Sequence, residues 1–244
     1  MKFCIIIPVY NHDFAVLSVL ENLKKFQLPC ILVNDGSSAE CRQSLIQYTQ
    51  QRVDWVMLID RPKNGGKGIA VLDGFKYAIA KGFTHAIQID ADGQHNTNDI
   101  PKIIEICRNA PNHLIFGKPV YESCAPFSRR YGRYIANFWV WVNTLSFAIV
   151  DGMCGFRLYP LHAVQQLLEH DIKLESGMAF DIDIAVRLYW QKFEVINFST
   201  IVTYPLDGIS HFKILNDNWQ ITKTHTKLFF GMLFRIVDLI ARHF

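Results

Sequence analysis

Residues 87–95 read Ile-Gln-Ile-Asp-Ala-Asp-Gly-Gln-His, an apolar, β-branched run that stops at two carboxylates. Such a run predicts a buried strand over residues 84–90. Side chains two residues apart on a strand share a face, so Asp90 and Asp92 are expected to converge at the strand's carboxyl end. Ligands bind at that edge of open α/β sheets, and paired carboxylates suit Mg²⁺ or Mn²⁺. The alternative is an acid pair that only forms a turn and caps the next helix.

Strands and helices alternate on both sides of this stretch. Strands are predicted at residues 3–9, 30–34, 55–60, 84–90 and 113–117, and helices at 13–27, 38–51, 67–81 and 98–108. This alternation predicts an α/β fold with a mostly parallel central sheet and helices on both faces. The later sequence predicts helices at 127–150, 161–170, 178–191 and 215–243, a short strand at 153–159 and a strand pair at 193–205. One domain is expected over residues 1–244, with parts at 1–117 and 118–213 and a terminal amphipathic helix at 214–244.

The composition narrows the class of protein. Half of the residues are hydrophobic, and the net charge of +3 is too small to indicate a nucleic-acid partner. The six cysteines are scattered without zinc-binding spacing, which indicates thiols in a reducing compartment. The amino-terminal segment does not read as a signal peptide, and no stretch has the length of an apolar membrane span. A cytoplasmic protein is therefore expected.

Polar residues follow the other predicted strands as well. The first strand ends in Pro8-Val9-Tyr10-Asn11, which places Tyr10 and Asn11 at the ligand-binding edge. Asp35 follows the second strand. Its carboxylate can accept a hydrogen bond from a nucleobase N–H or a ribose hydroxyl, or the residue can simply form a turn. The loop at 61–68 carries three glycines and two lysines before a helix, a composition that favours phosphate binding.

In this order, four segments resemble the family 2 glycosyltransferases, whose nucleotide-diphospho-sugar transferase fold is called GT-A. They are residues 8–11, 34–37, 64–68 and 90–95, and the Asp-Ala-Asp-x-Gln-His sequence of the last is most similar to the dolichol- or polyprenyl-phosphate branch. The resemblance implies that Asp35 contacts the nucleobase and that Asp90 and Asp92 hold a metal–diphosphate, with Gln94 as a further metal ligand. The full set of residues implied to bind the nucleotide sugar is Pro8, Tyr10, Asn11, Asp35, Lys67, Asp90, Ala91 and Asp92. The resemblance also implies that residues 1–117 are the nucleotide-sugar-binding part and residues 118–213 the acceptor-side part.

The second half offers two more polar segments. Residues 155–157 read Gly-Phe-Arg, a sequence that this branch of the family often carries. Arg157 is expected either to face an anionic acceptor or to brace its own loop. His211, in a Ser-His-Phe sequence, can complete a metal or diphosphate site because neutral imidazole suits Mn²⁺. The alternative is a loop histidine bonded to the backbone.

Two acids begin the helix predicted at 178–191. Asp183 lies four residues before Arg187, so the two are expected to form a surface ion pair. Asp181 lies about 200° around the helix from Asp183, in the first turn, where the helix dipole keeps a carboxylate ionised. The family places its catalytic carboxylate at a similar position, and Asp181 is therefore the candidate base. A purely structural acid at the helix start is the alternative.

Two segments combine aromatic and basic residues. One is residues 134–150, preceded by Arg129, Arg130 and Arg133, and the other is the final predicted helix. Such segments suit helices that lie on an anionic membrane surface, at the inner face of the cell membrane, and core packing is the alternative.

These features together predict an inverting, metal-dependent glycosyltransferase that uses Mg²⁺ or Mn²⁺. A sugar would pass from a UDP- or GDP-linked donor to a lipid-linked or saccharide acceptor. A hydroxyl acceptor needs a base such as Asp181, whereas a polyprenyl phosphate brings its own charge. The lack of a spanning segment favours a hydroxyl. The alternatives are a nucleotidyltransferase of related fold and a non-catalytic nucleotide-sugar-binding module.

Overall fold

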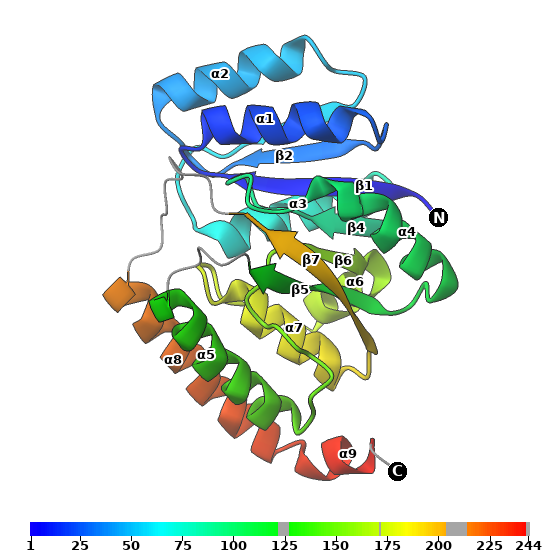
Figure 1. Cartoon of the computed structure of the whole chain (residues 1–244), viewed down its shortest axis with the longest axis vertical. Helices are drawn as coiled ribbons and strands as arrows, with labels where there is room; N and C mark the ends of the chain where they lie inside the picture. Colours follow the sequence, from blue (N-terminus) through cyan, green and yellow to red (C-terminus); the bar gives the residue numbers. More distant parts are fainter. Residues whose placement is uncertain (122–126, 171, 204–213, 243–244) are drawn as a thin grey trace.

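The computed structural model describes residues 1–121, 127–170, 172–203 and 214–242 (Figure 1). The strands among them are β1 (Phe3–Val9), β2 (Cys30–Asn34), β3 (Val56–Asp60), β4 (His85–Gln88), β5 (Leu114–Tyr121), β6 (Arg157–Pro160) and β7 (Val195–Val202). The α-helices are α1 (Asp13–Lys24), α2 (Ala39–Gln50), α3 (Lys67–Ala80), α4 (Ile100–Asn109), α5 (Phe127–Thr144), α6 (Leu161–Glu169), α7 (Phe180–Trp190), α8 (Ile214–Leu233) and α9 (Ile236–Ala241).

The strands form one seven-stranded sheet in the order β3-β2-β1-β4-β6-β5-β7. Strands β1 to β4 pair in parallel, as do β5 and β7, which confirms the predicted mostly parallel sheet. Strand β6 is antiparallel to both of its neighbours, and its first residue, Arg157, pairs with Gln88 at the end of β4. The segment before β6 therefore arrives at the edge where the parallel strands end.

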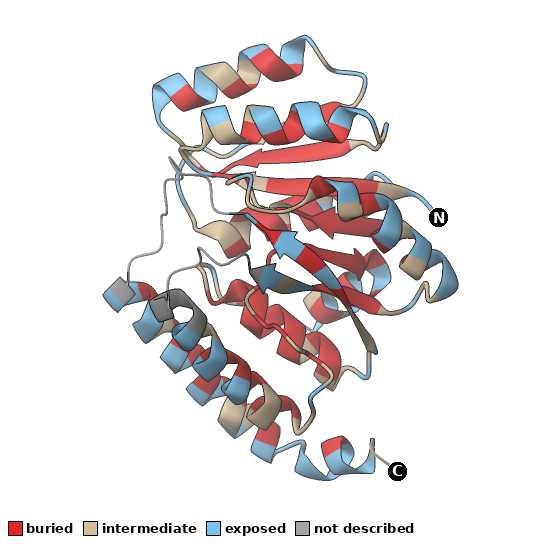
Figure 2. Ribbon diagram, viewed as in Figure 1, coloured by how far each residue is buried: buried red, intermediate tan, exposed pale blue. Residues whose placement is uncertain are grey.

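Helices cover both faces of the sheet because the central strands are apolar on both sides. On β1, Cys4 and Ile6 pack in a core with α3, α6 and α7, whereas Ile5 and Ile7 pack with α1, α2 and α4. This alternation is the two-residue period of a strand with two buried faces. Figure 2 shows that α7 is almost wholly buried, and Figure 1 shows it between the sheet and the α5–α8 pair.

The structure corrects several predicted elements. Residues 195–202 form a single strand that runs parallel to β5, where a strand pair was expected. The predicted final helix is divided into α8 and α9. Strand β4 ends at Gln88, so both acids of the Asp-Ala-Asp sequence lie in the following loop rather than on the strand. The strand predicted at 113–117 extends to Tyr121 as β5.

Candidate functional site

Lys67 is the centre of the site. Its ammonium nitrogen, Nζ, lies 2.7 Å from Asp90 Oδ1 and 2.7 Å from Asp181 Oδ2. Lys67 is the first residue of α3, Asp90 follows β4 and Asp181 lies in the first turn of α7. Gln88, the last residue of β4, donates from Nε2 to Asp181 Oδ1 over 2.8 Å. One lysine thus bridges two acids that come from opposite halves of the chain.

Electrostatics keeps this cluster charged. Burial lowers the pKa of Lys67, but Asp181 and Asp90 outweigh it, and the pKa is raised well above its usual value. Burial raises the pKa of Asp90, but Lys67 and His95 outweigh it, and the net shift is downward. Buried charges are tolerated when they are paired in this way. Lys67 and Asp90 therefore remain an ammonium and a carboxylate throughout the neutral range.

A cavity of about 120 Å³ opens beside the cluster. Asp90, Asp92, Gln94 and His95 from the loop after β4 line one side, and the rest of its lining is Pro119, Arg133, Met153, Cys154, Gly155 and Val202. Asp90 and Asp92 thus line one cavity, although both lie in the loop after β4 and not on a strand. Asp181 is only 2% exposed and is not part of this described lining.

The cavity has oxygen donors that fit Mg²⁺ or Mn²⁺. Asp92 accepts one backbone hydrogen bond, from Gln94 N to Oδ1 over 3.0 Å, and Asp90 is shared with Lys67. Within the described ranges, no three His, Cys, Asp or Glu side chains gather into a metal-binding cluster. A divalent ion would therefore take Asp92, Asp90 and the amide oxygen of Gln94 from these residues and the rest of its ligands from a diphosphate and water. His211 lies outside the described residues.

Arg133, from α5, brings a cation to the lining of the cavity. It forms a two-pronged ion pair with Asp151, from Nε to Oδ2 over 2.5 Å and from Nη2 to Oδ1 over 3.1 Å. Asp151 also accepts from the backbone N–H groups of Met153 and Cys154. Burial raises the pKa of Asp151, but Arg133 outweighs it and the pKa is lowered. The arginine is therefore held in a fixed orientation at the cavity wall.

Asp35 anchors the glycine-rich loop. Its Oδ1 accepts from Gly65 N (2.9 Å) and its Oδ2 from Gly66 N (2.8 Å), and Arg61 pairs with the same carboxylate. Gly68 N donates to the carbonyl oxygen of Ser176 over 2.7 Å. These three N–H groups are used within the protein, so interpreting them as a phosphate cradle is wrong. The loop instead fixes where Lys67 begins α3.

The glycines of this loop are required for close approach. A Cβ atom at Gly66 would lie 2.4 Å from the carbonyl oxygen of Ser176, and one at Gly68 would lie 2.3 Å from that of Glu175. Gly66 also has a φ of +94°, which side-chain-bearing residues rarely adopt. The loop therefore packs directly on the segment that leads into α7, and this contact sets Lys67 beside Asp181.

Comparison with known sequences identifies the family. Residues 4–167, which include all four of the polar segments at the strand ends, match the model of Glycosyl transferase family 2. The chain belongs to this family. It is therefore a glycosyltransferase, and the nucleotidyltransferase and non-catalytic alternatives are set aside.

Relatives in the family include enzymes named for lipid phosphates. The UDP-N-acetylglucosamine–dolichyl-phosphate N-acetylglucosaminyltransferase of Methanococcus voltae is 26% identical over 68% of this chain and 72% of its own length. The undecaprenyl-phosphate mannosyltransferase of Micrococcus luteus is 23% identical over 77% of each chain. These similarities place the chain near the polyprenyl-phosphate branch.

The fold is GT-A, as the resemblance implied. Glucosyl-3-phosphoglycerate synthase from Mycobacterium tuberculosis, solved with Mn²⁺, UDP and phosphoglyceric acid, superposes with a TM-score of 0.69 at 12% identity. The match covers 93% of this chain and 78% of that chain. The sheet and the helices on its two faces thus form the GT-A fold.

Two predicted roles in the second half change with the structure. Arg157 is fully buried and bonds to backbone oxygens, so it braces its loop and does not face an acceptor. Asp183 does pair with Arg187, over 2.6 Å, but its carboxylate is only 1% exposed, so the pair is not a surface pair. Bracing was one of the two alternatives for Arg157, whereas the surface pair was wrong because the four-residue spacing does not reveal that α7 lies under α5 and α8.

The loop after β1 is hydrogen-bonded to the loop after β2. Asn11 accepts from Ser38 N at Oδ1 over 2.8 Å and donates from its backbone N–H to Ser37 Oγ over 3.0 Å. Pro8 lies within β1, Tyr10 is partly exposed just after this strand, and Ala91 is buried between the two acids.

Sequence reasoning missed Gln88, for which the available signal was a polar residue within an apolar strand.

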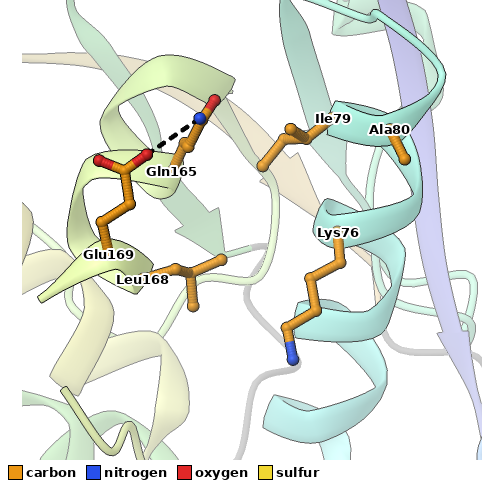
Figure 3. Close-up of a pocket in the computed structure, with 6 residues that line it drawn as sticks. All are labelled: Lys76, Ile79, Ala80, Gln165, Leu168 and Glu169. Atoms are coloured by element: carbon orange, nitrogen blue, oxygen red, sulfur yellow. Dashed lines mark hydrogen bonds between the residues drawn. The ribbon is translucent and has the colours of Figure 1, made fainter. Parts of the chain in front are cut away.

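A second hollow, of about 390 Å³, lies between α3 and α6 (Figure 3). Its lining consists of Lys76, Ile79, Ala80, Gln165, Leu168 and Glu169, with Gln165 donating to Glu169 over 3.0 Å. These side chains include no member of the Lys67 cluster, and the hollow is not part of the site.

Proposed function

We propose that the enzyme transfers a sugar, with inversion and with a divalent ion, from a nucleotide diphosphate to a polyprenyl phosphate. Arg133 carries this proposal, because its guanidinium, held by Asp151, lies in the lining of the same cavity as Asp90 and Asp92. A guanidinium of this kind suits a phosphate. Relatives named for dolichyl phosphate and undecaprenyl phosphate support the same acceptor. A phosphate acceptor replaces the hydroxyl that the sequence favoured.

Each side of the cavity has its own task in the proposed reaction. Asp90, Asp92 and Gln94 would hold the ion, which would offset the charge that develops on the leaving diphosphate. Lys67 adds a second positive charge beside the diphosphate, and the loop anchored on Asp35 fixes its position. Arg133 orients the acceptor phosphate toward the anomeric carbon, opposite the leaving group.

Asp181 does not act as the base in this proposal. Its carboxylate is 2% exposed and accepts from Lys67 and Gln88, so it lies behind the lysine rather than beside an acceptor. A phosphate oxygen is already ionised at neutral pH and attacks without losing a proton. Asp181 is therefore a positioning residue that acts through Lys67.

Peripheral contact with an anionic membrane completes the proposal. The inner sides of α5 and α8 are buried, while their outer sides expose aromatic residues: Tyr131, Tyr134, Phe138, Trp139, Trp219 and Phe230 (Figure 2). Lys223 lies 5.3 Å from the centre of the Trp219 ring, so positive charge accompanies this face. Aromatic and basic residues together suit the membrane interface. Among the described helices, none has the length and apolarity needed to cross a bilayer.

The proposal is tested by comparing polyprenyl phosphate with the free polyprenol. Purified enzyme is supplied with Mn²⁺ and with UDP- and GDP-linked sugars, and the lipid product is measured. We expect transfer to the phosphate alone, and we expect Arg133→Gln to reduce it at least about tenfold, the cost of one lost charged hydrogen bond. Arg108→Gln, at an exposed site on α4, is the matched control. Equal transfer to the polyprenol would refute the phosphate acceptor.

A further inference from the structure

Residues 155–157, the Gly-Phe-Arg segment, touch the site from behind. They lead into β6, whose first residue pairs with the last residue of β4. In order, the three residues contact Asp90, His95 and Asp181. The segment is therefore in contact with both acids that Lys67 bridges.

Gly155 leaves room for the carboxylate of Asp90. A Cβ atom at position 155 would lie 2.2 Å from Asp90 Oδ2 and 2.5 Å from its Oδ1 and Cγ. Gly155 is not one of the glycines with positive φ, so space rather than backbone conformation requires a glycine here. Asp90 cannot easily withdraw, because Lys67 holds its other face at 2.7 Å.

Phe156 supports the histidine beside that carboxylate. Its ring is fully buried and lies 5.4 Å, centre to centre, from the ring of His95. His95 Nε2 in turn lies 3.5 Å from Asp90 Oδ2. An edge contact with Phe198 at 5.5 Å fixes the phenyl ring from the other side. Phe156 thus restricts the position of the Asp90 carboxylate through His95.

Arg157 ties the start of α7 to this loop. Its fully buried guanidinium donates from Nη1 to the backbone oxygen of Asp181 and from Nε to that of Cys154, each over 2.6 Å. The charged plane lies over the ring of Phe116, 4.4 Å from its centre. A buried cation with these partners is costly to rearrange. Arg157 therefore fixes the backbone that carries the Asp181 carboxylate.

We propose that residues 155–157 form a positioning element that sets the separation of Asp90 and Asp181, so that one ammonium bridges both. Gly155 and Phe156 set the position of Asp90, and Arg157 sets that of Asp181. Lys67 is then placed by its two contacts from outside its own helix, with Asp90 and Asp181. The inference deepens the proposed function and rests on it only for the donor-binding measurement below.

The test compares Gly155→Ala with Gly152→Ala. Gly152 lies in the same loop, and a Cβ there would meet Val140 Cγ2 at 2.7 Å without touching a site carboxylate. In each background, Lys67→Met and Asp90→Asn are made singly and together, and the unfolding equilibrium is measured in urea. The four proteins give the coupling between Lys67 and Asp90 without any need for activity.

We expect the coupling, expressed as a ratio of unfolding constants, to fall at least about fivefold in Gly155→Ala and to stay within about twofold in Gly152→Ala. Equal coupling in the two backgrounds overturns the inference. If Gly155→Ala does not fold, Arg157→Lys and the Lys67–Asp181 pair are used with the same criteria. Arg157→Lys keeps the charge, but an ammonium cannot replace the planar guanidinium that donates to the backbone oxygens of both Cys154 and Asp181.

Donor binding provides the second readout. Calorimetry with Mn²⁺ and UDP or GDP is expected to show at least about tenfold weaker binding in Gly155→Ala than in Gly152→Ala. Similar affinities in the two variants would contradict the positioning role. Failure of wild-type protein to bind either nucleotide would refute the proposed function instead, and the coupling measurement would still decide the inference.

Discussion

Asp181→Asn tests whether Asp181 acts as a catalytic base or only positions Lys67. The change removes one of the two negative charges beside Lys67 and keeps the shape of the side chain. Asp181 is 2% exposed, and its Oδ2 lies 2.7 Å from the ammonium. Removing one partner of a buried ion pair costs about 3–5 kcal/mol. Asp90 remains at 2.7 Å as a second counter-charge, so we expect the low end, about 3 kcal/mol.

Thermal unfolding measures this cost. For a chain of this size, 3 kcal/mol lowers the Tm by about 6–12 °C. Asp183→Asn is the matched control, because Asp183 lies two residues further along the same helix and has its own buried pair with Arg187. Both variants should lose stability, but only Asp181→Asn should weaken binding of UDP or GDP, since only Asp181 contacts Lys67.

The double variant Lys67→Met/Asp181→Asn then decides how Asp181 acts. A positioning residue works through Lys67, so the double variant should transfer sugar at the rate of Lys67→Met alone. An independent base would add a further loss of about 10²–10⁴ in rate. A double variant that is slower than Lys67→Met by this factor would refute our reasoning. Asp181 would then be the base for a hydroxyl acceptor.

Three further predictions concern the metal, pH and the membrane. Asp92→Asn should abolish the gain in UDP affinity that Mn²⁺ gives in calorimetry, because Asp92 faces the cavity. Burial lowers the pKa of His225 to about 4. As the pH falls, His225 therefore takes up a proton in the unfolded chain before it does so in the folded protein. Urea titrations should show that the free energy of unfolding falls between about pH 6.5 and 4, by about 1.4 kcal/mol per pH unit. His225→Phe should remove this slope, whereas exposed His162→Phe should not. Flotation with anionic liposomes should fail for Phe138→Ser/Phe230→Ser but not for Phe14→Ser, whose phenylalanine is exposed on α1.

Local patterns in the sequence were sufficient to predict most of the sheet. Apolar runs predicted β1 and β2 to the residue, because a strand buried on both faces leaves few polar positions. The four-residue spacing of Asp183 and Arg187 predicted their contact, since a helix brings such residues together wherever it lies. These features depend on neighbours in the chain and need no knowledge of the fold.

Only the tertiary structure decided which of the polar residues meet. Lys67 and Asp181 are 114 positions apart, and they touch because the glycine loop packs on the segment before α7. The antiparallel direction of β6 placed Gly155 and Arg157 behind the two acids. Periodicity specifies which face of an element is apolar, but it does not specify which other element covers that face. For this reason the sequence located the site at the ends of the strands, and the packing of α7 and β6 determined that Lys67 lies at its centre.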